Sequence, residues 1–92
     1  MSVWRQARLL AGLGGMPRIT PISWRRLRSV FERDGFVFVK RTDGSHWIGE
    51  KPGVARPIVI PEYSEIGLDI IQANMRTAKM SRERYFKLLR EC

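Results

Sequence analysis

Residues 35–63, GFVFVKRTDGSHWIGEKPGVARPIVIPEY, decide the fold of this chain. The stretch contains three short runs in which β-branched and aromatic side chains are frequent, as they are in β-strands. These runs span residues 36–41, 45–50 and 56–60. Joined by two turns, they predict a three-stranded antiparallel meander, and His46, the only histidine of the chain, opens the middle strand.

The two turns are marked by glycine and proline. Asp43-Gly44 is typical of a tight hairpin, because glycine adopts positive φ without a Cβ clash. Pro52-Gly53 separates the second run from the third, since proline cannot donate to a strand ladder. Pro61 closes the third run.

A helix is predicted before the meander. Thr20 or Ser23 can cap its N-terminus, and Asp34-Gly35 ends it, because glycine is the residue expected just past a helix C-terminus. The apolar face of this helix is formed by Trp24, Leu27, Val30 and Phe31.

Two helices are predicted after the meander. The first runs from Ile66 or Leu68 to Lys79, and Ser81 caps a short C-terminal helix. The predicted fold class is therefore α+β, with the order α-β-β-β-α and a short helix at the end. Because the helices can cover only one face of the sheet, the other face stays partly open, and function is expected there or in the loops at its edge.

The chain divides into two parts. We expect residues 1–18 to be a flexible or non-essential leader, since Gly12, Gly14 and Gly15 break a short helical pattern. Residues 19–92 form a single domain with enough apolar content to fold without disulfides.

Cysteine usage and hydropathy limit the class of protein. Cys92 is the only cysteine, so a disulfide framework and a His/Cys zinc cluster are excluded. No apolar run approaches the length that spans a bilayer. We therefore expect a cytoplasmic protein with no membrane contact and no small-molecule cofactor.

The charge is strongly positive and unevenly distributed. The formal net charge is +8; residues 1–31 hold six arginines and no acid, whereas residues 32–92 hold eleven bases and nine acids. Such an excess favours a polyanionic partner such as nucleic acid. A solvated basic face without a ligand is the alternative, and charge alone does not decide between them.

The hairpin at residues 40–46 gathers the groups that cleavage of a phosphodiester requires. Lys40 and Arg41 can neutralise phosphate, Ser45 can hold it, and the imidazole of His46 can transfer protons near neutral pH. RNA supplies its own nucleophile in the 2′-hydroxyl, so no metal is needed. A lone histidine on a strand is more often a surface or core residue, and this alternative stays open.

Six residues are candidate RNA contacts: Arg26, Lys40, Arg41, Lys51, Arg56 and Tyr63. The basic ones among them are equally typical of exposed strand edges, where charge prevents aggregation. Trp47 is expected in the core, with base stacking as the alternative. The sequence contains no phosphate-binding glycine loop and no recognisable pattern of metal ligands.

Taken together, these elements resemble the HicA toxin family of mRNA interferases. The resemblance rests on a helix ending at Gly35, an aromatic strand, the triplet Gly44-Ser45-His46 and a strand closed by Pro61. It covers about residues 19–90 and includes a second helix followed by a Ser-capped short helix.

Two positions depart from the pattern of that family. The chain has Pro61-Glu62-Tyr63 where members commonly have a triplet like Pro-Arg-His, and it has Lys79 where glycine is often found.

The resemblance implies a double-stranded-RNA-binding-like fold and metal-independent endoribonuclease activity on mRNA. By position, His46 is the catalytic histidine, and Gly44 and Ser45 are turn residues. The resemblance also implies a cognate HicB-type antitoxin that covers the active site.

Two other functions remain open from the sequence. One is a non-catalytic RNA-binding or antitoxin-docking module of the same fold. The other is an interaction domain whose basic first helix contacts an acidic protein.

Overall fold

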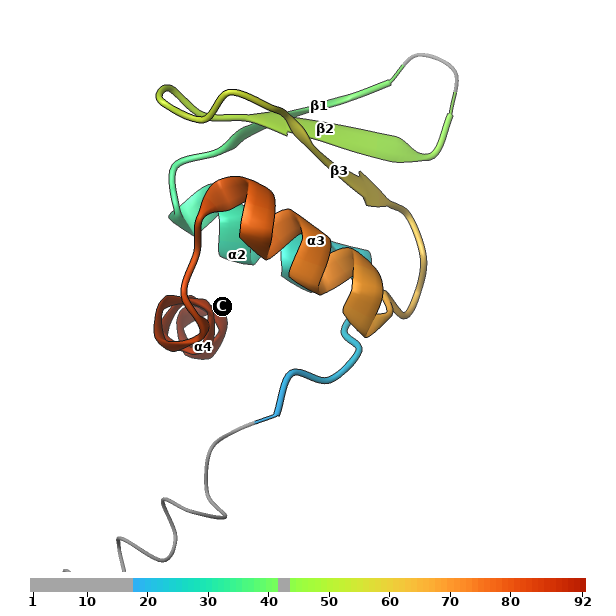
Figure 1. Ribbon diagram of the computed structural model, residues 1–92. Coiled ribbons are helices and arrows are strands. Elements are labelled where there is room, and N and C mark those ends of the chain that lie inside the picture. Colours follow the sequence, from blue (N-terminus) through green and yellow to red (C-terminus); the bar gives the residue numbers. More distant parts are fainter. Residues whose placement is uncertain (1–17, 42–43) are drawn as a thin grey trace, which may run out of the picture.

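The computed structural model describes residues 18–41 and 44–92 (Figure 1). The elements follow in the order α2 (Trp24–Arg33), β1 (Val37–Lys40), β2 (His46–Glu50), β3 (Ile58–Pro61), α3 (Leu68–Ala78) and α4 (Arg82–Glu91). The predicted α+β class with a three-stranded antiparallel sheet is confirmed. The predicted leader lies outside the described residues except for Arg18.

The sheet is a meander in which β2 lies between β1 and β3 and runs antiparallel to both. The third strand begins at Ile58, later than predicted, because Pro57 has no N–H to donate and stays in the connection. Pro61 is the last residue of β3 and not the residue that follows the strand, and it pairs with His46.

Alternation along the strands gives the sheet two different faces. The side chains that face the helices are Phe38, Lys40, Trp47, Gly49, Ile58 and Ile60. On the other side lie Val37, Val39, His46, Ile48, Glu50 and Val59. We refer to this second side as the open face, since the helices all lie on the opposite side of the sheet (Figure 1).

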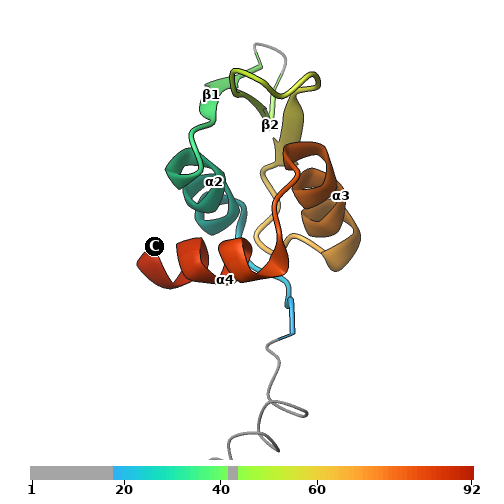
Figure 2. The same ribbon diagram turned by 60° about the vertical axis from the view of Figure 1, so that its left-hand side comes forward.

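The helices all lie on one side of the sheet. Helices α2 and α3 lie side by side, and α4 crosses below them (Figure 2). The fully buried side chains between these elements include Leu27, Val30 and Phe31 from α2, Ile71 from α3 and Tyr85 from α4. From α3, Asn74 Nδ2 donates to the carbonyl oxygen of Val59 at 3.2 Å, which attaches this helix to the edge strand β3.

The ends of α2 follow the sequence signals. The Ser23 hydroxyl accepts a hydrogen bond from the backbone N–H of Arg26 at 3.3 Å, so Ser23 is the N-cap and Thr20 is not. At the other end Asp34 is the C-cap, and Gly35 turns the chain into β1 with a φ of +106°. Ser81 caps α4 in the same way as Ser23 caps α2, as predicted.

Asp34 also links the helices to the end of the sheet where the β2–β3 connection lies. Its side chain is only 7% exposed, and its two oxygens accept from Arg84 Nε at 2.8 Å and from Lys51 Nζ at 3.4 Å. These bonds join the end of α2 to α4 and to the β2–β3 connection. Paired charges of this kind are costly to break, because the remaining partner loses its compensation.

The close packing of β1 on β2 depends on a glycine. A Cβ on Gly49 would lie 2.5 Å from Phe38 Cε2, well inside van der Waals contact. The ring of Phe38 therefore occupies the space that a side chain at position 49 would need, and it packs against the core from there.

We predict that Gly49→Ala destabilises the fold by about 1–3 kcal/mol, because the Phe38 ring must leave its packed position. The measurement is urea unfolding followed by circular dichroism. Val39→Ala, on the open face and 62% exposed, is the control and is expected to stay within about 0.5 kcal/mol of wild type. Equal stability of Gly49→Ala and wild type would show that the ring is not confined there.

Candidate active site

His46 is the first residue of β2 and lies exposed on the open face. The backbone around it is held from both neighbouring segments. Its carbonyl oxygen accepts from the N–H of Arg41 at 3.0 Å, and the carbonyl oxygen of Ser45 accepts from the N–H of Glu62 at 2.9 Å. The imidazole thus stands on a fixed strand end while its ring remains accessible to a substrate.

A cation and a proline flank this histidine across the sheet. Arg41 continues the register of β1 and lies opposite His46, and Pro61 lies opposite it on β3. Residues that pair directly across antiparallel strands share a face of the sheet, so Arg41 and His46 are neighbours on the open face. Of the two predicted turn residues, Gly44 donates its N–H to the Arg41 carbonyl at 3.3 Å, and Ser45 is exposed.

The opposite face of the same sheet end carries an aromatic and charged group that we name the tryptophan cluster: Trp24, Arg28, Lys40, Trp47 and Glu62. Trp24 and Trp47 stack with their ring centroids 5.7 Å apart and their planes 17° apart. The guanidinium of Arg28 lies over both rings, 4.5 Å from the centroid of Trp47 and 5.3 Å from that of Trp24. Such an arrangement adds cation–π attraction to the stacking.

Glu62 connects this cluster to the hairpin. Its Oε2 accepts from Trp47 Nε1 at 2.8 Å and pairs with Lys40 Nζ at 3.1 Å. Hydrogen bonds from Trp47 and Lys40 hold the pKa of Glu62 below its ordinary value of 4.5, against a partial loss of hydration; Arg25 adds a smaller attraction.

The predicted RNA contacts do not form a single surface. Lys40 points to the covered side and is paired with Glu62, so it does not share the face of His46. Lys51 is bound to Asp34 and serves the packing of the fold. Arg26 reaches toward α4, where its Nη2 donates to the Leu89 carbonyl at 3.5 Å.

The remaining two candidates lie at different ends of β3. Tyr63 follows β3 and is 53% exposed; its carbonyl oxygen accepts from the N–H of Trp24 at 3.2 Å. Tyr63 therefore stands near the end of the sheet that carries His46. Arg56 precedes β3 and belongs to the opposite end, beside α3.

The sequence analysis missed most of the tryptophan cluster. Trp47 was expected in the core, and it is indeed half-buried, but its partner Trp24 comes from another element. The role of Glu62 as acceptor for Trp47 and Lys40 was not predicted either. The available signal was the occurrence of Glu62 directly after Pro61, which places a carboxylate at the end of β3.

Among residues 18–41 and 44–92, no three His, Cys, Asp or Glu side chains come together as ligands for a metal ion. In that same part of the chain, no helix is both long and apolar enough to cross a bilayer.

Residues 24–80 match the family model described as the HicA toxin of bacterial toxin–antitoxin systems, which is more than half of the chain. The chain belongs to the HicA toxin family. No curated protein and no solved structure matches it significantly.

The region matched to the HicA toxin family begins with the first residue of α2 and ends just before the cap of α4. It therefore includes His46, Arg41 and the whole tryptophan cluster. Membership identifies the chain as a toxin-type component of a two-part system, whose partner is a cognate antitoxin.

We predict that Glu62 makes stability depend on pH in the acidic range. Its pKa is lower in the folded state than in the unfolded chain, so the stabilisation is complete above about pH 4.5 and disappears as the pH falls through the folded-state value. Glu62→Gln should therefore melt below wild type at about pH 7, and the difference should shrink as the pH falls below 4.5.

The matched control is Glu65→Gln, which removes an exposed carboxylate from the same connection. It should differ little from wild type across the whole range. A constant gap between Glu62→Gln and wild type at every pH would contradict the assigned role of the carboxylate.

Proposed function

We propose that this member of the HicA toxin family is a metal-independent endoribonuclease that cleaves mRNA in the cytoplasm, with His46 transferring a proton. The supporting observation is an exposed imidazole on a fixed strand end of the open face, in a chain of a toxin family. Arg41 lies opposite and can neutralise the phosphate.

In this mechanism the 2′-hydroxyl of a nucleotide attacks the adjacent phosphorus. Its proton passes to a base, and the bond between phosphorus and the 5′-oxygen breaks as that oxygen receives a proton from an acid. The products are a 2′,3′-cyclic phosphate and a 5′-hydroxyl end. His46 performs one of the two transfers, and Tyr63, a lysine or water performs the other.

The strand geometry suits this role, because proton transfer depends on a catalytic group held in place. Two backbone hydrogen bonds fix the segment that carries His46, one from Arg41 and one from Glu62. The ring itself extends to the side of the sheet that no described helix covers. A nucleotide can therefore approach it without displacement of the core.

We predict that His46→Ala abolishes cleavage of single-stranded RNA while the melting temperature stays close to that of wild type, since the side chain is exposed. The assay is carried out in EDTA, and the 5′-hydroxyl and cyclic phosphate ends are identified chemically. Loss of a general acid or base typically lowers the rate by about 10²–10⁴-fold.

Glu50→Ala is the matched control, because Glu50 lies on the same strand and the same face at the other end. It should cleave like wild type. Undiminished cleavage by His46→Ala would remove His46 from the mechanism. Salt-sensitive RNA binding without any product, in wild type and variant alike, would instead identify a non-catalytic RNA-binding module.

A second element of the proposal concerns the antitoxin. The open face carries exposed apolar side chains. Val39, 62% exposed, and Val59, 38% exposed, lie two residues along their strands from the residues opposite His46, and Val37, 70% exposed, lies toward the other end of the face. Adjacent apolar side chains exposed on one surface often mark a protein interface. We propose that a HicB-type antitoxin binds this face and thereby covers His46.

We predict that Val39→Asp weakens binding of the cognate antitoxin by at least about tenfold, because a carboxylate would lose its hydration in the contact. The measurement is co-purification followed by calorimetric titration. Leu68→Asp, which alters an apolar residue 41% exposed at the start of α3, is the control and should bind normally. Equal affinity of both variants would place the antitoxin elsewhere.

A further inference from the structure

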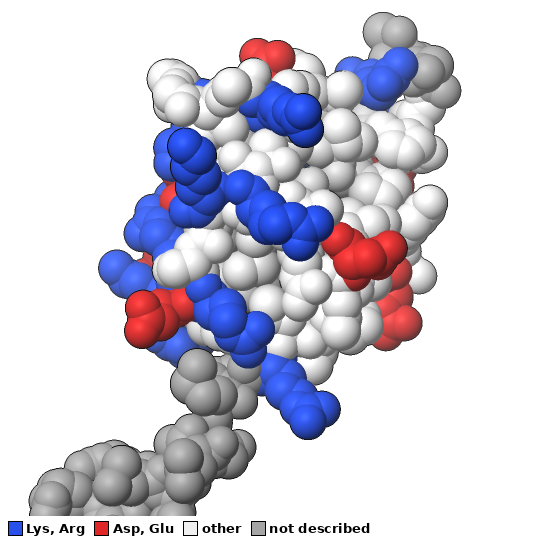
Figure 3. Space-filling view, viewed as in Figure 1, with Lys and Arg blue, Asp and Glu red and all other residues white. Residues whose placement is uncertain are grey.

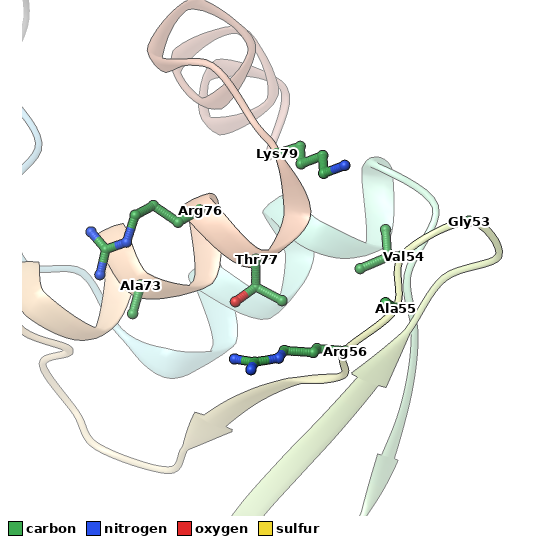
Figure 4. Close-up of a pocket in the computed structure, with 8 residues that line it drawn as sticks. All are labelled: Gly53, Val54, Ala55, Arg56, Ala73, Arg76, Thr77 and Lys79. Carbon is green, nitrogen blue, oxygen red and sulfur yellow. The ribbon is translucent and has the colours of Figure 1, made fainter.

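A hollow of about 560 Å³ lies between the β2–β3 connection and the C-terminal half of α3 (Figure 4). Its lining residues are Gly53, Val54, Ala55, Arg56, Ala73, Arg76, Thr77 and Lys79. We refer to it as the α3 groove. It lies at the end of the sheet opposite to His46, since β2 begins with His46 and the connection follows the other end of that strand.

Three cations surround this groove and no carboxylate lines it. Arg56 extends along the side of the groove below Thr77, Arg76 lies toward one end and Lys79 toward the other (Figure 4). All three are exposed, and none forms an ion pair with a residue of the described part of the chain.

Several other cations of the described segments pair with carboxylates. Arg28 pairs with Glu32, Arg33 with Glu91 and Lys40 with Glu62, and Asp34 takes both Lys51 and Arg84. Figure 3 shows Lys and Arg side chains gathered over the half of this surface where α3 ends and the β2–β3 connection passes. Three of the cations that have no carboxylate partner thus lie together around the α3 groove.

The end of α3 does not account for these charges. A helix C-terminus carries about half a unit of negative charge, which one cation in the last turn offsets. Here three full positive charges surround the groove, and Arg56 comes from a different element. An excess of positive charge remains for an external anion.

The backbone at Lys79 gives an independent indication. Lys79 has a φ of +56°, and it is the single residue other than glycine with positive φ in residues 18–41 and 44–92. Glycine adopts this conformation without steric cost, whereas a lysine is strained in it. Strained backbone positions cluster at binding and catalytic sites, so the strain at Lys79 indicates that its cationic side chain has a function.

The chemistry of the lining selects a phosphate ligand over a protein. Two guanidinium groups can each bind phosphate through two hydrogen bonds, and the Thr77 hydroxyl can add another. Protein interfaces depend on large aromatic or aliphatic anchors at their centre. The apolar part of this lining consists only of Val54, Ala55 and Ala73.

We propose that the α3 groove binds the phosphate backbone of RNA, as a second contact remote from His46. Arg56 lies five residues before Pro61, the partner of His46, so the two sites are separated by roughly 15 Å along the sheet. Several nucleotides cover this distance. The inference rests on the proposed function only in taking RNA as the source of the phosphates.

The test measures binding of a fluorescein-labelled single-stranded RNA of about 12 nucleotides by anisotropy at several salt concentrations. All variants are made in the full chain carrying His46→Ala, so that cleavage does not interfere. Lys79→Gly, Arg56→Gln and Arg76→Gln should each bind more weakly. Each should reduce the slope of log K against log salt by about 0.7, and the triple variant by about 2.

Lys79→Gly separates binding from folding. Because glycine relieves the strain at this φ, its melting temperature should equal or exceed that of the parent while its RNA affinity falls. Lys87→Gln, which removes one exposed charge from α4, is the control and should change neither the affinity nor the salt slope.

The outcomes distinguish this proposal from the proposed nuclease activity, which is assayed in parallel with His46 intact. Weaker binding by the groove variants, without cleavage by the chain with His46, would support the groove and overturn the nuclease. Cleavage by that chain, with groove variants that bind RNA as tightly as Lys87→Gln, would overturn the groove. Groove variants that lose affinity for the antitoxin and not for RNA would also overturn it.

Discussion

The burial of Ile58 and Ile60 determines how the rest of the molecule is arranged. These two isoleucine side chains of β3 are at most 1% exposed. Burial of each against the helices contributes about 1.5–3 kcal/mol to the stability of the fold. Alternation along the strand then directs Val59 to the other side of the sheet, and cross-strand pairing transmits this alternation to β2. The exposure of His46 therefore follows from apolar side chains on the opposite side of the sheet.

Much of this arrangement could be predicted, because its signals are local. Ser23 and Ser81 cap helices by accepting hydrogen bonds from the N–H groups three residues later, and Gly35 ends α2 at the expected position. Strand composition located the meander, although proline shifted the start of β3. His46 becomes a candidate through the order of elements around it, and the region that contains this order matches the HicA toxin family.

What could not be predicted is which distant side chains meet. Trp24 and Trp47 stack only because α2 packs beneath the sheet, and no local pattern encodes that contact. Lys51 was a candidate RNA ligand, yet it pairs with Asp34, a residue whose burial depends on three elements. A net charge of +8 likewise does not reveal where charge remains available. Carboxylates neutralise several cations, and three others lie together around the α3 groove.

The glycine beneath the Phe38 ring also bears on the proposed catalysis. Gly49 is the only residue of β2 without a side chain, so only one alignment of the hairpin leaves room for the ring. That alignment also sets which residue stands across from His46. A substitution at one end of the strand would therefore impair the proposed proton transfer at the other end through misalignment, in a protein that still folds and still retains its imidazole.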